Sequence, residues 1–247
     1  MSKNLSKDYL CGRHAIEACL NQQGKSNYFA KANSLWLKRP DIELEKLAKK
    51  NNIAVTIVEK ANGLSADIAR DLEAHHQLLW IDVIVPSLDL FNWDAAKTLM
   101  LVDHITDTQN LGSIMRSACA MNVDGLFYPK HAQASITSRV RFIAQGAAES
   151  LPSYRIANVN QWLQSAKDER FWIYGFAENG SLDLHKTVFS DKSVLVVGSE
   201  DRGIRSQTAT QCDFLIKIPT SSSFSCLNAA SAASIMLYER YRQQLAN

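Results

Sequence analysis

The sequence predicts an α/β protein in which a small α/β domain precedes a larger domain built on a parallel sheet. From about residue 98 onward, short apolar segments alternate strictly with segments of helical periodicity. Some of these segments, such as 194–197, are apolar at every position, which indicates strands buried on both faces of a parallel sheet. Between the two parts, Pro86 and a polar, tryptophan-containing stretch break the pattern. We therefore expect domains at 1–86 and 98–247, joined by a linker at 87–97.

The expected elements of the first domain are short. Asp41 follows a proline and precedes a run with helical spacing, so it is expected to cap a helix that ends at Lys50. β-Branched and apolar residues at 54–58 and 78–85 are typical of strands. The remaining predictions are a helix at 13–20 and a strand at 34–38.

The second domain is expected to repeat strand and helix in turn. Strands are predicted at 99–103, 125–128, 155–157, 171–176, 194–197 and 214–218, and helices at 110–121, 138–149, 159–167, 205–211 and 227–244. Ligands of open parallel sheets bind beyond the carboxyl ends of the strands. The loops that follow Val102, Val197 and Ile218 are therefore the places to look for chemistry.

Composition limits the function classes. With 27 Lys and Arg against 25 Asp and Glu, the net charge is +2, so any nucleic-acid site must depend on local basic patches. The candidates are Arg139 and Arg141 near a helix start, and Lys3, Lys7 and Arg13 near the amino terminus. Apolar residues at 46% exclude disorder and collagen-like repeats.

The five cysteines lie far apart and form no CxxC, and the histidines show no zinc spacing. They predict buried thiols in a reducing compartment and no metal site. The first residues contain no apolar stretch of the signal-peptide type, and no segment is long enough to span a bilayer. A cytoplasmic protein is expected.

Three loops carry the residues of interest. In the first, Asn110 can cap a helix, Gly112 permits close approach of a ligand, and Arg116 can bind an anion near the first-turn amides. Taken alone, this loop is better explained as an ordinary helix cap followed by a surface arginine. In the second, Gly198 and Gly203 imitate a phosphate-binding loop, but Ile204 replaces the required lysine, and the chain contains no GxGxxG.

The third loop runs from Ile218 and Pro219 through a serine-rich turn into a helix of small residues. Its serines lack the GxSxG frame of a nucleophile. Cys226 stands at a helix start, where a thiol pKa can fall, but no histidine is placed beside it by the sequence.

In order and spacing, the three loops resemble the three motifs of the SpoU (TrmH-type) branch of the SPOUT RNA methyltransferases. The resemblance extends to 145–152 and to 12–18, the latter resembling the small substrate-binding domain of bacterial 23S rRNA guanosine-2'-O-methyltransferases. The residues that match the three motifs are Asn110, Gly112 and Arg116, then Gly198, Glu200 and Gly203, then Ile218, Pro219, Leu227, Asn228, Tyr238 and Glu239.

The resemblance implies a deep trefoil knot near the carboxyl end, S-adenosylmethionine bound within it without a metal, and a homodimer. It implies an L30e-like RNA-binding domain at 1–86 and methylation of a guanosine ribose 2'-OH in 23S rRNA. The implied catalytic residues are Asn110, Arg116, Glu200 and Asn228, and the implied cofactor-binding residues, acting through backbone groups, are Gly198, Ile218 and Leu227.

The third loop departs from the family pattern. Thr220 and Ser222 replace a usual Met and Gly, Cys226 replaces a Ser, and Ala230 lacks the hydroxyl of another usual Ser. The changes at Cys226 and Ala230 keep open the alternative of a catalytically weak RNA-binding relative. A second alternative keeps the chemistry and changes the substrate: a tRNA 2'-O-methyltransferase of the same family.

Overall fold

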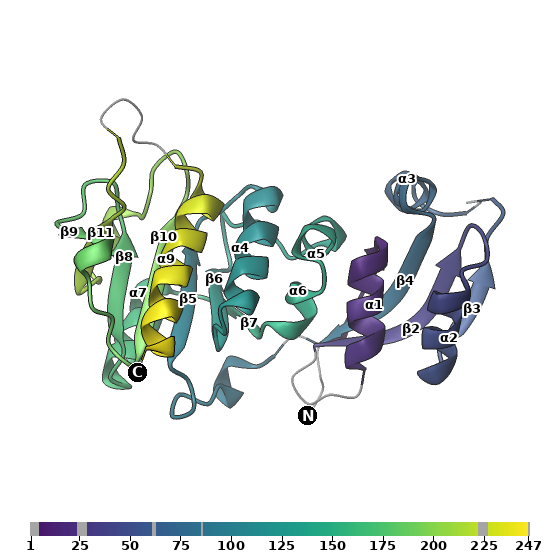
Figure 1. Ribbon diagram of the computed structural model, residues 1–247, viewed down its shortest axis with the longest axis horizontal. Helices are drawn as coiled ribbons and strands as arrows, with labels where there is room; N and C mark the ends of the chain where they lie inside the picture. Colours follow the sequence, from purple (N-terminus) through teal and green to yellow (C-terminus); the bar gives the residue numbers. More distant parts are fainter. Residues whose placement is uncertain (1–4, 24–28, 61–62, 85, 222–226, 247) are drawn as a thin grey trace. The chain divides into compact units, whose positions relative to one another are not determined.

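The computed structural model describes residues 5–23, 29–60, 63–84, 86–221 and 227–246 (Figure 1). Contacts divide the chain into two compact units: residues 1–85 with 136–150, and residues 86–135 with 151–247. Each unit contains its own sheet and helices, so the predicted α/β class is confirmed. The segment 136–150, which the sequence places inside the second domain, belongs by its contacts to the first unit.

The first unit contains a four-stranded sheet in the order β1-β4-β2-β3. Only β2 and β3 are parallel, and β4 pairs antiparallel with both β1 and β2. The strands are β1 (Leu5–Cys11), β2 (Ala30–Leu37), β3 (Ala54–Ile57) and β4 (Gln77–Ile84), and the helices are α1 (Arg13–Gln22), α2 (Ile42–Lys50), α3 (Ala66–His75), α5 (Ser138–Ala144) and α6 (Ala147–Ser150). β1 and α3 were not predicted from the sequence. The Asp41 cap of α2 is confirmed, because Asp41 accepts a hydrogen bond from the Leu44 amide.

Helices cover both faces of this sheet. Leu79 and Ile81 of β4 point into a cluster with the apolar sides of α1 and α2. Leu78 and Trp80, one position out of phase, point to the opposite face and pack with α3. The alternation therefore produces a three-layer unit with a core on each side of the sheet.

The segment 136–150 is held to the first unit by a buried ion-pair group. The Arg141 guanidinium is 4% exposed and lies 2.6 Å from Glu149 and 3.0 Å from Asp8 of β1. The Phe29 amide donates to the Glu149 carbonyl oxygen at 2.8 Å. Arg141 is thus neutralised and buried, so the prediction that it contributes to an RNA-binding patch is wrong.

The helix predicted at 138–149 is in fact broken into α5 and α6. Gln145 and Gly146 both have positive φ, 51° and 94°, which ends α5 in a left-handed turn. The glycine is needed for a second reason: a Cβ atom at position 146 would lie 2.5 Å from the Cβ of Ala18 on α1.

Replacing Gly146 by alanine is therefore expected to destabilise the first unit by about 2–4 kcal/mol, because backbone strain and overpacking add together. Gly63→Ala is the matched control, since Gly63 also has positive φ (79°) but a Cβ there would meet no atom within 4 Å. Urea unfolding of both variants measures the difference. Equal losses in the two variants would show that the contact with Ala18 contributes nothing.

The second unit is built on a seven-stranded sheet in the order β7-β6-β5-β10-β8-β11-β9, and every paired strand is parallel. The predicted parallel sheet is confirmed. Its strands are β5 (Thr98–Asp103), β6 (Gly125–Pro129), β7 (Ser153–Ile156), β8 (Trp172–Phe176), β9 (Leu182–Asp183), β10 (Ser193–Gly198) and β11 (Phe214–Lys217). Its helices are α4 (Thr108–Ala120), α7 (Val159–Asp168), α8 (Ser206–Ala209) and α9 (Ala229–Leu245), with 3-10 turns η1 (Leu88–Leu90) and η2 (Leu184–Lys186).

Helices also cover the faces of this sheet. On one face, Trp162 and Leu163 of α7 pack against alternate residues of β5, β8 and β10. α4 and α9 lie side by side (Figure 1), joined by a hydrogen bond of 2.8 Å between the Ser117 and Ser234 hydroxyls. Both helices begin at the carboxyl ends of the strands, which directs their first turns to the same edge of the sheet. Of the helices in the described ranges, none is long and apolar enough to cross a lipid bilayer.

Candidate active site

The three strands predicted to end at the site are β5, β10 and β11. β5 and β10 are neighbours, and their last residues, Asp103 and Gly198, are paired in register. β8 lies between β10 and β11. At ordinary strand spacing, the ends of β10 and β11 are therefore about 10 Å apart.

The first site residue, Asn110, lies in the first turn of α4 and is 7% exposed. It does not cap this helix as predicted. Asp107 is the cap, and its carboxylate accepts hydrogen bonds from the amides of Gln109 (2.6 Å) and Asn110 (3.0 Å). Aspartate is as strong a capping residue as asparagine, so a cap three residues earlier was open to prediction. Because Asp107 takes this role, the Asn110 amide group is available for another partner.

The loop after β10 folds back on the strand that precedes it. The Gly203 amide donates to the Ser199 carbonyl oxygen at 2.8 Å, and the two residues form an isolated β-bridge. Gly198 is buried beneath this turn, and a Cβ there would overlap the carbonyl group of Gly203. Gly203 itself has φ of 62°. Both glycines are therefore required by the turn, on which Glu200, Asp201 and Arg202 are exposed.

Three of the predicted catalytic residues meet around Glu200. The Asn110 Nδ2 donates to Glu200 Oε1 at 2.8 Å, and the Asn228 Nδ2 donates to the same oxygen and to Asn110 Oδ1 at 2.9 Å. The Ala229 amide lies 3.4 Å from Glu200 Oε1. Asn228 also caps α9, since its Oδ1 accepts from the amides of Ala230 and Ser231. Residues 110, 200 and 228, far apart in the chain, thus form one hydrogen-bonded group.

The other predicted residues lie near these elements without joining that group. Arg116 is on α4, about 9 Å along the helix axis from Asn110; it is exposed and makes no ion pair with any described residue. Ile218 directly follows β11 and Leu227 directly precedes the Asn228 cap, and both are half-buried. Ser222 and Cys226 lie outside the described residues.

Cys11, Cys119 and Cys212 are unsuited to nucleophilic chemistry. Burial raises the pKa of the Cys11 and Cys212 thiols to about 12, and it also raises the pKa of Cys119. Thiols with raised pKa values stay protonated and are poor nucleophiles.

The predicted basic patch of the first unit is partly neutralised. Arg13 pairs with Glu17 and Asp41, each at 2.6 Å, and with Glu43. Three carboxylates around one guanidinium leave no net positive charge for a phosphate. Lys7 and Arg139 are exposed, and their contribution to RNA binding stays a prediction; Lys3 lies outside the described residues.

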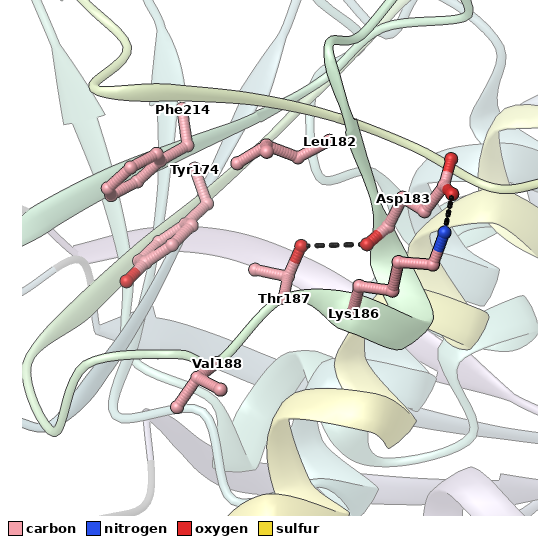
Figure 2. Close-up of a pocket in the computed structure, with 7 residues that line it drawn as sticks. All are labelled: Tyr174, Leu182, Asp183, Lys186, Thr187, Val188 and Phe214. Carbon is pink, nitrogen blue, oxygen red and sulfur yellow. Dashed lines mark hydrogen bonds and ion pairs between the residues drawn. The ribbon is translucent and has the colours of Figure 1, made fainter.

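A pocket of about 310 Å³ lies at the β9 edge of the same sheet. Figure 2 shows the stacked rings of Tyr174 and Phe214 on one side and the ion pair of Lys186 with Asp183, 3.1 Å long, on the other. The hydrogen bond from Lys186 lowers the pKa of Asp183. None of the predicted site residues lines this pocket. Within the described chain, no group of three or more His, Cys, Asp or Glu is placed to hold a metal ion.

Asp103 was missed by the sequence analysis as a residue of interest. It ends the apolar strand β5, is 0% exposed, and its carboxylate faces Arg205 of the loop that follows β10. The sequence feature that could have identified it is a charged residue at the end of an apolar strand, because a charged side chain is rarely buried unless it is paired.

Alanine in place of Gly198 is expected to open the Glu200 turn, because a Cβ and the Gly203 carbonyl cannot occupy the same space. Gly203→Ala serves as the comparison, since a Cβ there meets nothing within 4 Å and only the positive φ is strained. We expect thermal unfolding at least about 5 °C lower for Gly198→Ala than for Gly203→Ala. Equal unfolding temperatures would contradict the packing argument.

Curated proteins are similar to this chain in sequence, and solved structures are similar to it in fold. An uncharacterized tRNA/rRNA methyltransferase of Synechocystis is 33% identical over 96% of this chain, which spans 63% of that relative. The 23S rRNA (guanosine-2'-O-)-methyltransferase RlmB of Vibrio vulnificus is 30% identical over 98% of this chain and 100% of its own length. The crystal structure of the SpoU methyltransferase AviRb from Streptomyces viridochromogenes in complex with AdoMet matches with a TM-score of 0.79 at 23% identity, covering 98% of this chain and 91% of that one.

The second unit of this chain is a parallel sheet whose strand ends bring together residues of three separated loops. The chain thus has the fold of the SpoU methyltransferases. The SpoU rRNA Methylase family model matches residues 97–238. The chain belongs to this family. The predicted family and the predicted class of enzyme, an RNA methyltransferase, are confirmed.

Proposed function

We propose that this protein transfers a methyl group from S-adenosylmethionine to the ribose 2'-OH of a guanosine in 23S rRNA, in the cytoplasm. The observation that carries the proposal is the hydrogen-bonded group of Asn110, Glu200 and Asn228 at the strand ends. It is supported by the full-length similarity to RlmB of Vibrio vulnificus, whose name states this reaction. A cofactor of the same kind is named for the AviRb complex.

The residues at the strand ends fit such a cofactor. The half-buried Ile218 and Leu227 offer apolar contact to a purine, and Gly198, whose Cβ position is filled by the Gly203 carbonyl, can contribute only its backbone groups. When bound, the cofactor supplies a methyl group already activated by a sulfonium. We assign its binding to Gly198, Ile218 and Leu227.

The chain's own residues must orient the ribose and handle its proton. Glu200 is exposed, and its Oε1 is held by two asparagine amide groups, so the carboxylate is fixed in direction and remains an acceptor. We assign it the removal of the 2'-OH proton. Asn110 and Asn228 fix Glu200 and orient the ribose beside it.

Arg116 is assigned a different role. A guanidinium stays protonated and cannot act as a base. With no ion pair among the described residues, it is available to bind the phosphate next to the target ribose and to stabilise negative charge on the 2'-oxygen.

We assign RNA binding to the first unit and propose that the protein acts as a homodimer with a knotted carboxyl-terminal segment. The similarity to RlmB covers the first unit as well as the second. On α9, the side chains of Ile235, Tyr238 and Leu245 are exposed, and an exposed apolar row of this kind is suited to a second copy of the chain. Light scattering at micromolar concentration tests the dimer, and a monomer mass would remove it from the proposal.

Calorimetry with S-adenosylmethionine and methylation assays on 23S rRNA fragments and on tRNA test the function. Cofactor binding with 2'-O-methylation of the rRNA fragment is expected. Methylation of tRNA but not of the rRNA fragment would show that the protein is a tRNA 2'-O-methyltransferase. RNA binding without cofactor binding would identify a weak relative, for which Ala230 is the visible reason, since this buried position lacks a hydroxyl. Mass mapping of rRNA with and without the protein then locates the nucleotide.

A further inference from the structure

The Asp103 carboxylate lies at the junction of two loops that lead to the site. It accepts hydrogen bonds from the Arg205 backbone amide at 3.3 Å and from Arg205 Nε at 3.2 Å. On its other side, His104 Nδ1 lies 2.6 Å from Oδ1. The carboxylate is 0% exposed, while the His104 and Arg205 side chains are 19% and 44% exposed. A buried carboxylate is tolerated because these donors surround it.

Through Arg205, this carboxylate fixes the far end of the Glu200 turn. The near end is fixed by Gly198 in β10 and by the Ser199–Gly203 bridge. Arg205 comes two residues after Gly203, so the turn has an anchor at each end. The second anchor crosses from β10 to its neighbour β5.

Through His104, the same carboxylate also fixes the loop that leads to α4. His104 has φ of 67°, a left-handed conformation that a bulky side chain adopts only where its surroundings hold it. The ring contact with Asp103 provides that hold. Six residues later the chain reaches Asn110, so Asp103 is tied to both loops whose side chains meet at Glu200.

We propose that Asp103 is a positioning residue that, through Arg205 and His104, keeps the Glu200 turn and the loop before α4 in the relative placement the reaction requires. The proposal rests on the proposed function, since it names residues that serve the same site. Asp103 touches neither substrate nor cofactor in this role. It acts on Glu200 by holding the backbone on which Glu200 stands.

Arg205→Ala is the test variant, because Arg205 is half-exposed and its removal leaves Asp103 bonded to His104 and to the backbone amide at position 205. We expect kcat to fall about 10- to 100-fold with the KM for RNA nearly unchanged. Arg205→Lys is expected to recover part of the loss, since one amine replaces one of the side-chain donors. Asp103→Asn keeps the shape of the side chain but loses its charge, and we expect its kcat to fall at least as far as that of Arg205→Ala.

Lys167→Ala is the matched control. Lys167 pairs with Asp213 at 2.8 Å, at the opposite end of the sheet, so this variant loses an ion pair of the same unit far from the strand ends. If Arg205→Ala and Lys167→Ala lower kcat and stability alike, the proposed positioning role is wrong.

Amide hydrogen exchange gives a readout that needs no activity. In Arg205→Ala without ligand, the Gly203 amide is expected to exchange about 10-fold faster, because its bond to Ser199 loses the neighbouring anchor. Unchanged exchange would overturn the proposal even if the wild-type protein methylates rRNA. Faster exchange in a protein whose wild type methylates no RNA would instead retain the anchor and overturn the proposed function.

Discussion

Glu200→Gln is expected to lower the rate of rRNA methylation by about 100-fold or more, without loss of cofactor binding. The glutamine oxygen can still accept hydrogen bonds from Asn110 and Asn228, so the local geometry survives. The variant loses the negative charge and therefore cannot take up the 2'-OH proton. General base catalysis typically contributes a rate factor of about 100 or more. Single-turnover methylation of a 23S rRNA fragment measures the rate.

The control for this variant is Asn228→Asp, which keeps the cap of α9 but places a second carboxylate beside Glu200. We expect it to impair the rate as well, because an aspartate cannot donate the hydrogen bond that Asn228 Nδ2 gives to Glu200 and repels its charge. A Glu200→Gln enzyme within twofold of the wild type would show that Glu200 only holds the loop and that the proton leaves by another route.

Arg116→Ala is expected to reduce the methylation rate by about 100- to 1000-fold, the effect of removing one donor that stabilises developing oxyanion charge. Arg116→Lys should recover only part of the activity, because a single ammonium cannot reproduce the two-pronged contact of a guanidinium with a phosphate. Rates at saturating RNA separate this effect from weaker RNA binding.

Arg170→Ala provides the matched comparison. Arg170 is likewise an exposed arginine of the second unit, but it precedes β8 at the amino ends of the strands. It should retain wild-type activity. Full activity in Arg116→Ala would show that Arg116 does not bind the phosphate as proposed. An equal loss in both variants would point to a general effect of surface charge.

The sequence was sufficient for the parallel sheet of the second unit, because strands such as β10 are apolar throughout and have no alternative to burial on both faces. It was less informative for α3, whose only fully buried side chain is Leu72 and whose apolar face is correspondingly narrow. β1 was missed because its residues Ser6, Lys7 and Asp8 are polar, and their strand state comes from pairing with β4, which lies about seventy residues away.

At the site, residue spacing identified Asn110, Glu200 and Asn228 but not what they do to one another. The bonds between them depend on the turn of Gly198 and on Asp107 taking the helix cap, and both are properties of the folded backbone. Asp103 was missed for the same reason: its partner Arg205 is a hundred residues distant in the chain. The predicted roles of the site residues stay predictions until the variants are measured.

The excursion of residues 136–150 into the first unit has a consequence for how this protein can be divided. The backbone passes from one unit to the other three times, so no single cut separates them. A fragment starting at residue 86 would contain the whole span matched by the family model, yet it would leave Arg141 without Asp8 and Gly146 without Ala18. The span that the family model matches is therefore not a unit that folds by itself. We expect a protein truncated before residue 86 to aggregate unless the segment 136–150 is shortened as well.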